Sequence, residues 1–156
     1  MQFIADVHLG KLARILRLLG FDVYYRNNLD DPEIANLSAE SGRLVLSRDR
    51  GLLKRRLIKN SLFISSTDPI QQTVQVITAL GLESDIRPFT RCSRCGAPIQ
   101  PVKKDTVYQE LPASVRDKYS VFYQCELCGK LFWKGDHFRT MDRLFEKLAE
   151  RPNLQG

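Results

Sequence analysis

Short apolar segments alternate with segments of helical periodicity over residues 2–81. In residues 9–19, leucine and alanine recur at three- and four-residue intervals, which predicts an amphipathic helix that Gly20 ends. Four apolar runs between the helical segments have the length of strands, at residues 3–5, 23–25, 44–46 and 62–64. Strands and helices in this alternation form a parallel sheet with helices on both faces, and right-handed crossovers bring the carboxyl ends of the strands to one edge. We therefore expect a three-layer α/β domain with a central, mostly parallel sheet and a ligand site at that edge.

The alternation ends near Arg87-Pro88, where the composition changes. Residues 88–135 are rich in cysteine, proline and lysine, and residues 136–150 carry apolar side chains on one helical face. We expect a first domain at 1–87, a second at 88–150 that ends in a helix, and a tail at 151–156. The 156 residues, 43% of them hydrophobic, are enough to bury a core, which excludes a mainly disordered chain.

The four cysteines form two pairs of the same kind, Cys92-Ser-Arg-Cys95-Gly and Cys125-Glu-Leu-Cys128-Gly. Each spacing lets both sulfurs reach one metal, and four thiolates make a tetrahedral set that suits zinc. A set of four protein ligands leaves no open position, so the zinc would be structural. Redox-active or unpaired core cysteines are the alternatives. Between the pairs, the apolar residues 107–108 and 121–123 are the expected hairpin strands of a zinc ribbon.

Aspartates stand where the predicted strands end. Asp6 follows the first strand, Asp49 follows the third, and Asp30 and Asp31 open the helix after the second. Because the carboxyl ends of parallel strands meet at one edge, these carboxylates are expected to converge there. Magnesium or manganese would bind such oxygens, activate a water and stabilise charge on a phosphate. The alternative for Asp6, Asp30 and Asp31 is a helix cap.

The chain is basic, with 24 Lys and Arg against 18 Asp and Glu, a net charge of +6 and a pI near 9.3. Residues 43–59 hold seven basic residues around one acid, Asp49. This pattern indicates a polyanionic partner: Asp49 would bind a metal ion, and the basic side chains would bind phosphate groups. The expected phosphate contacts are Lys11, Arg14, Arg48, Arg50, Arg55 and Arg56. The alternatives are a solvated helix face for Lys11, Arg14 and Arg17, and an ion pair of Asp49 with a neighbouring arginine.

No apolar stretch approaches the about 20 residues that span a bilayer, so we expect no membrane partner. The first residues lack the basic and long apolar regions of a secretory signal peptide. These two observations predict a cytoplasmic protein, in which disulfides between the four cysteines are not expected.

Three stretches, taken in this order, resemble the Mut-seven C-terminal RNase family over residues 3 to about 145. They are Asp6-Val-His-Leu-Gly-Lys-Leu-Ala-Arg-Ile-Leu-Arg-Leu-Leu-Gly-Phe-Asp22 with Asp30-Asp31, Leu46-Ser-Arg-Asp49-Arg-Gly-Leu-Leu53, and Pro88-Phe-Thr-Arg-Cys92 with the cysteine pairs and Trp133-Lys-Gly-Asp-His137. Two positions depart from the family. Asp136 stands where serine is frequent, and Ser47 stands where threonine is common, which keeps the hydroxyl.

The resemblance implies a PIN-like nuclease fold followed by a four-cysteine zinc ribbon and a C-terminal helix. It implies a metal-dependent endoribonuclease that cleaves single-stranded RNA. By position, the catalytic acids would be Asp6, Asp49 and Asp31 or its neighbour Asp30, with magnesium or manganese as the cofactor. His137, which the family retains, would contact a phosphate or serve as a structural histidine.

PIN-like proteins often dimerise, so the resemblance makes a homodimer an expected state. The competing function is a non-catalytic RNA- or DNA-binding protein. For that function the zinc ribbon and the positive charge suffice, and the acids are helix caps.

Overall fold

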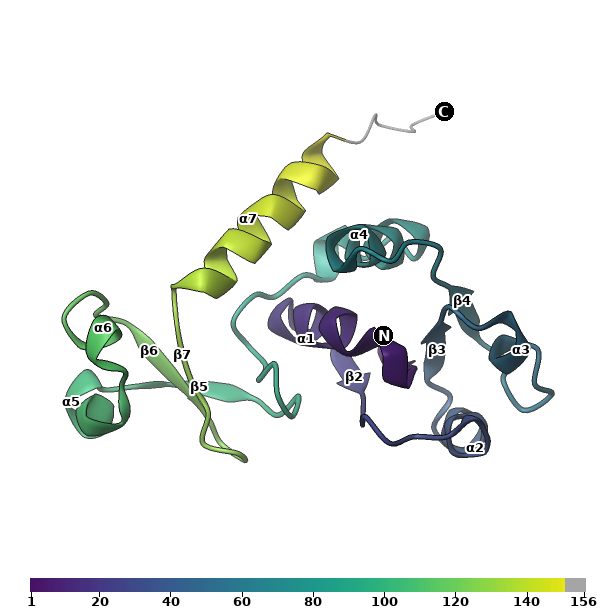
Figure 1. Cartoon of the computed structure of the whole chain (residues 1–156), viewed down its shortest axis with the longest axis horizontal. Coiled ribbons are helices and arrows are strands. Elements are labelled where there is room, and N and C mark those ends of the chain that lie inside the picture. The colour runs from purple at the N-terminus through teal and green to yellow at the C-terminus, as the bar shows by residue number, and fades with distance from the viewer. Residues whose placement is uncertain (151–156) are drawn as a thin grey trace. The chain divides into compact units, whose positions relative to one another are not determined.

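The computed structural model describes residues 1–150, except for the side chains of residues 136–138 (Figure 1). The chain divides into two units, Met1–Gly96 and Ala97–Gly156, and each unit has a sheet of its own.

The first unit is built on a sheet of four parallel strands. They are β1 (Gln2–Ala5), β2 (Asp22–Tyr24), β3 (Leu44–Ser47) and β4 (Ser61–Phe63), in the order β2-β1-β3-β4. Ala5 pairs with Leu46, so β1 and β3 end side by side at the centre of the sheet. The parallel sheet predicted from the sequence is confirmed.

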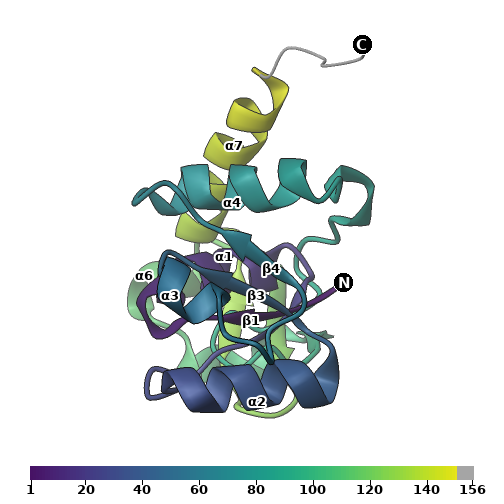
Figure 2. The same cartoon turned by 90° about the vertical axis from the view of Figure 1, so that its right-hand side faces the viewer.

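Helices cover both faces of this sheet. They are the 3-10 helix η1 (Val7–Leu9), α1 (Gly10–Leu18), α2 (Asp31–Ser41), α3 (Arg50–Leu53), α4 (Pro69–Ala79) and the 3-10 helix η2 (Glu83–Asp85). Figure 2 shows α1 and α4 on one side of the strands and α2 on the other. On the α2 side, Ile34 packs against Ile4 and Val45, and all three are fully buried. Burial of such side chains is the main force that holds the layers together.

Gly20 follows the last turn of α1 with a φ of +96°, where other residues are strained. A Cβ at this position would lie 2.5 Å from the carbonyl oxygen of Arg87. Glycine therefore ends the helix, as predicted, and lets residue 87 approach it closely.

The second unit has an antiparallel sheet. Its strands are β5 (Ile99–Val102), β6 (Phe122–Cys125) and β7 (Leu131–Trp133), and its helices are α5 (Lys104–Val107), the 3-10 helix η3 (Tyr108–Glu110), α6 (Ala113–Arg116) and α7 (Asp136–Ala149). A small core gathers Val107, Leu111 and Val115 around Phe122.

One expectation for this unit was wrong: residues 107–108 are helical and not a hairpin strand. Val107 at the end of α5 and Val115 in α6 pack with Leu111 and Phe122, so short helices fill this side of the small core. The strand expected at 121–123 is present as β6, which begins one residue later and ends two residues later.

Candidate functional site

The side chains of Asp6 and Ser47 meet at the carboxyl edge of the parallel sheet. The backbone N–H of Asp6 donates to the carbonyl of Leu46, which continues the β1–β3 pairing by one residue. The Ser47 hydroxyl then donates to Oδ2 of Asp6 at 2.8 Å. Asp6 is only 6% exposed and Ser47 is fully buried, so this hydrogen bond fixes the carboxylate. The side chain of Asp6 makes no capping bond to η1, so it does not serve as the helix cap.

Asp49 is tied to the same serine. Its backbone N–H donates to the Ser47 hydroxyl oxygen at 2.9 Å, so Ser47 bridges the two aspartates. Its own Oδ1 accepts from the N–H of Gly51 (2.8 Å) and of Leu52 (3.4 Å), which caps α3. Asp49 is exposed, and its Oδ2 accepts no hydrogen bond from the described residues. One oxygen therefore caps α3, and no described residue donates to the other.

The two aspartates before α2 differ in what they do. Asp30 caps the helix: its Oδ1 accepts from the N–H of Glu33 at 2.8 Å, and Oε2 of Glu33 accepts from the N–H of Asp30 at 3.2 Å. This reciprocal capping box is the structural alternative that the sequence left open for Asp30. Asp31, the first helical residue, is half-buried and has no hydrogen bond or ion pair to the described residues.

The aspartates at the strand ends do not form a group of three or more side chains placed to hold a metal ion. Within the described residues, the four cysteines are the only group of three or more His, Cys, Asp or Glu side chains placed to hold a metal ion. Asp6 and Asp49 are joined through Ser47, whereas Asp30 and Asp31 belong to the start of α2.

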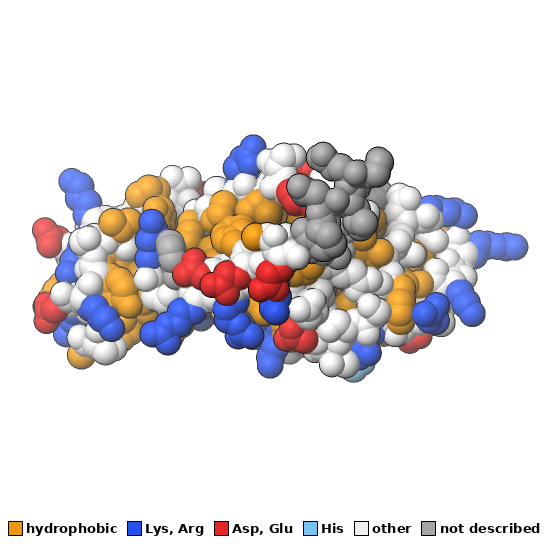
Figure 3. All heavy atoms as spheres, turned by 90° about the horizontal axis from the view of Figure 1, so that it is seen from above, with side chains coloured by type: hydrophobic (Ala, Val, Ile, Leu, Met, Phe, Trp, Pro, Cys, Tyr) orange, Lys and Arg blue, Asp and Glu red, His pale blue; other side chains and the backbone are white. Residues whose placement is uncertain are grey.

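The basic residues expected to contact phosphate are exposed: Lys11, Arg14, Arg48, Arg50, Arg55 and Arg56. The Arg50 guanidinium carbon lies 4.0 Å from the centroid of the Phe63 ring, a cation–π contact that orients it. No ion pair within the described part of the chain occupies any of the six. On the face that Figure 3 shows, Lys and Arg side chains project at many points, with Asp and Glu between them.

Lys11 and Arg14 line a pocket of about 330 Å³ with His8, Thr67 and Gln72. His8, one of the residues that line the pocket, is two residues after Asp6 in the sequence. No Asp or Glu lines the pocket. Sequence reasoning missed these partners of Lys11 and Arg14. The signal for His8 was its place just past the end of β1, whereas Thr67 and Gln72 come from a distant segment.

Arg43, in the same basic run, is a structural residue. Its guanidinium donates to the Asp22 carboxylate at 3.0 Å and to the carbonyl of Phe3 at 3.2 Å. Burial raises the pKa of Asp22, but the hydrogen bonds and charge of Arg43, with Arg91 and Gln2, lower the pKa below its ordinary value overall. This basic side chain is therefore not free to bind a phosphate.

The four cysteine sulfurs lie within 4.8 Å of one another, and none of the four cysteines forms a disulfide. In each pair an N–H donates to the first sulfur: Arg94 to Cys92 at 3.3 Å and Leu127 to Cys125 at 3.4 Å. The glycines that follow, Gly96 and Gly129, have φ of +81° and +77°. Thiolates supported by backbone donors at this spacing fit a tetrahedral zinc ion, so these residues could form a zinc site.

Arg17 is buried at 4% exposure, so the expectation of a solvated position on the first helix was wrong for this residue. Its Nε and Nη2 donate to the carbonyl of Val23 (3.1 and 2.9 Å), and its Nη1 donates to the carbonyl of Arg94 at 2.9 Å. Burial lowers the pKa of Arg17, and the nearby Cys95 and Cys92 raise it. The guanidinium thus supports the first cysteine pair from inside the unit.

The side chains of Asp136 and His137 lie outside the described residues, so the expected phosphate contact of His137 remains a prediction. No helix in the described part of the chain is long and apolar enough to cross a membrane.

The family model of the Mut7-C RNAse domain matches residues 1–145 of the chain. The chain belongs to the Mut7-C RNAse domain family. The resemblance found in the sequence is thereby confirmed, and membership in the Mut7-C family indicates a ribonuclease-type function. No curated protein and no solved structure matches the chain significantly.

Proposed function

We propose that this protein is a metal-dependent endoribonuclease of PIN-like fold that cleaves single-stranded RNA at the carboxyl edge of its parallel sheet. The observation that carries the proposal is the Asp6–Ser47–Asp49 chain of hydrogen bonds, at the centre of that edge, in a member of an RNase family. A buried carboxylate held in place by a buried hydroxyl is a costly arrangement that a purely structural aspartate does not need.

Magnesium or manganese fits this site by the chemistry of its donors. Magnesium keeps several waters and is usually held by one or two carboxylates together with substrate phosphates, so a cage of three acids is not required. Asp6 and Asp49 would hold the ion, with Asp31 as the further acid. When bound, it would supply Lewis acidity and a water of lowered pKa.

The protein's own groups would position the substrate. Ser47 keeps the Asp6 carboxylate in one orientation, because its hydroxyl donates to Oδ2 and is itself fully buried. Exposed basic side chains would neutralise phosphate oxygens of the RNA backbone. They are Lys11, Arg14, Arg48, Arg50, Arg55 and Arg56. We place His137 in the same role.

We further propose that the four cysteines hold a structural zinc ion in a ribbon that, with its C-terminal helix, spans 88–150, after a nuclease domain at 1–87. The donors support it, because the four sulfurs lie within 4.8 Å of one another and make a complete tetrahedral set. A cytoplasmic homodimer is part of the same proposal, and light scattering of the purified protein would measure its mass.

The test is cleavage of a labelled single-stranded RNA with manganese present. Asp6→Asn and Asp49→Asn should each reduce the rate by at least about 100-fold. Asn is as good a helix cap as Asp, so the fold at α3 should be retained. The matched control is Asp68→Asn, which changes the cap of α4 and should leave the rate unchanged. Full activity in both site variants would overturn the proposal.

A non-catalytic RNA-binding protein is the second candidate, and one observation favours it. The acidic side chains of the described residues are not gathered into a metal-holding group, as the cysteines are. Calorimetric titration of manganese into the wild-type protein and into Asp6→Asn separates the two. A binding protein should show no ion site that depends on Asp6.

A further inference from the structure

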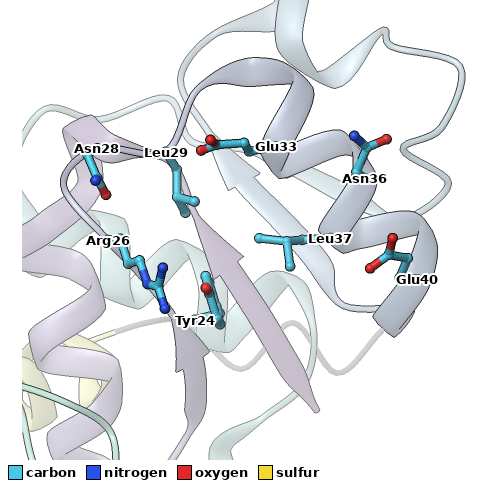
Figure 4. Close-up of a pocket in the computed structure, with 8 residues that line it drawn as sticks. All are labelled: Tyr24, Arg26, Asn28, Leu29, Glu33, Asn36, Leu37 and Glu40. Carbon is cyan, nitrogen blue, oxygen red and sulfur yellow. The ribbon is translucent and has the colours of Figure 1, made fainter.

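A second pocket, of about 320 Å³, lies between the edge strand β2 and helix α2 (Figure 4). Tyr24 is the last residue of β2, and Arg26 and Asn28 follow in the loop that leads to Asp30. The pocket thus begins at the carboxyl end of β2, where the chain leads to Asp30 and Asp31, and extends along α2 to Glu40 in the last turn of that helix. The proposed function assigns no role to this pocket. None of the lysines and arginines expected to contact phosphate lines it.

Flat and apolar groups form two walls of the pocket. The Arg26 guanidinium carbon lies 5.5 Å from the centroid of the Tyr24 ring. Leu37 faces them from α2, and both Tyr24 and Leu37 are half-buried against the core on that face. Figure 4 shows Arg26 and Tyr24 on one side and Leu37 with Glu40 on the other. Aromatic rings and guanidinium planes are the surfaces on which unpaired RNA bases stack.

Three polar side chains at the rim have no partner among the described residues. Asn28, Asn36 and Glu40 are exposed, and no hydrogen bond or ion pair to the described residues engages their side chains. Glu33 differs, because one of its oxygens accepts from the N–H of Asp30. Glu40 thus offers a whole carboxylate, an acceptor of hydrogen bonds only, across the pocket from a guanidinium that only donates.

We propose that this pocket binds an unpaired guanine base of the RNA, an inference that rests on the proposed function. Guanine presents two adjacent N–H donors, N1 and N2, which match the Glu40 carboxylate, and two acceptors, O6 and N7, which match Arg26. Adenine, cytosine and uracil each lack the paired donors. The N1 and N2 groups are engaged in duplex RNA, so the pocket selects a single strand and sets the base beside the cut.

The first experiment measures binding alone. Labelled oligouridines carrying a single central guanosine, adenosine or cytidine are titrated with the full chain by fluorescence anisotropy, without added divalent ions. The guanosine RNA should bind at least about fivefold more tightly than the others. Glu40→Gln should abolish this preference, and the matched control Glu83→Gln, an exposed acid outside the pocket, should keep it. Equal affinity of the wild type for all three RNAs overturns the inference.

The second experiment separates the pocket from the catalytic proposal. The same RNAs are incubated with manganese and the cuts are mapped at nucleotide resolution. Cleavage clustered beside guanosine, and dispersed in Glu40→Gln, supports both proposals. Cleavage without base preference overturns the pocket and leaves the nuclease intact. Guanosine-selective binding with no cleavage supports the pocket and overturns the nuclease.

Discussion

Ser47 connects the two aspartates of the proposed site. Among the described residues, it is the only one whose side chain forms hydrogen bonds with both Asp6 and Asp49. Ser47→Ala should raise the manganese concentration for half-maximal cleavage and reduce the rate by about tenfold, since Asp6 loses its donor. Stability should fall by about 1–2 kcal/mol. Ser47→Thr keeps the hydroxyl and should restore most of the activity.

The control for Ser47 is Ser38→Ala. Ser38 is also buried, and its hydroxyl donates to the carbonyl of Arg43 at 3.0 Å. This variant should lose comparable stability in urea unfolding with no change in manganese dependence. If Ser38→Ala shifts the manganese dependence as much as Ser47→Ala does, the role of Ser47 is only structural.

Arg17 is a buried cation whose hydrogen bonds to described residues all go to backbone carbonyls and none to a carboxylate. Cys92 and Cys95 are among its neighbours. Four thiolates around Zn²⁺ carry a net negative charge, so the guanidinium would neutralise the proposed zinc site. Arg17→Met should lower stability by about 2–4 kcal/mol, because the carbonyls of Val23, Ser93 and Arg94 lose their donor. Zinc should leave for a chelator about tenfold more readily. Arg14→Met, exposed on the same helix, is the control and should match the wild type in both measurements.

At the level of elements, Arg43 and Asp22 fasten three strands together. Arg43 precedes β3, Asp22 begins β2, and the guanidinium also reaches the carbonyl of Phe3 in β1. The folded-state pKa of Asp22 is lowered, so its contribution to stability is present above about pH 4 and is lost as the pH falls through that lowered value. Asp22→Asn should therefore cost about 1 kcal/mol near neutral pH and progressively less in acid.

Urea unfolding of wild type and Asp22→Asn from neutral pH to strong acid measures this difference. The exposed Asp85→Asn serves as the control and should track the wild type throughout. A difference that stays constant across the whole range would contradict the assigned role of the Arg43–Asp22 pair.

The elements of the first unit were predictable, because each strand and helix there has a clear period and most boundaries carry a glycine or an aspartate. Sequence reasoning failed where the apolar run was too short to show a period, as at Val107–Tyr108. Arg17 shows the other limit. Its spacing matches that of Lys11 and Arg14, and its burial depends on the Val23 carbonyl and on the distant residues 93–96, which contact its guanidinium.

At the scale of the whole molecule, the two units differ in how much apolar core supports them. The parallel sheet is buried on both faces, with Phe3, Leu12, Leu46 and Ile64 almost fully inaccessible. The second unit relies on a small cluster around Phe122 and on three short strands. A segment of this size rarely holds together on hydrophobic burial alone, and a bound metal is a common supplement.

Removal of zinc should therefore act unevenly along the chain. After stripping with a chelator, backbone amides of β5–β7 should lose most of their protection against hydrogen exchange, because metal binding contributes folding free energy there. Amides of β1–β4 and α2 should remain protected, since the buried cluster of Ile4, Ile34 and Val45 that joins them contains no cysteine. Cys125→Ser should reproduce the pattern without a chelator, and added zinc should restore only the stripped wild type. Full protection of β5–β7 in protein shown to be free of metal would contradict a stabilising role of zinc in the second unit.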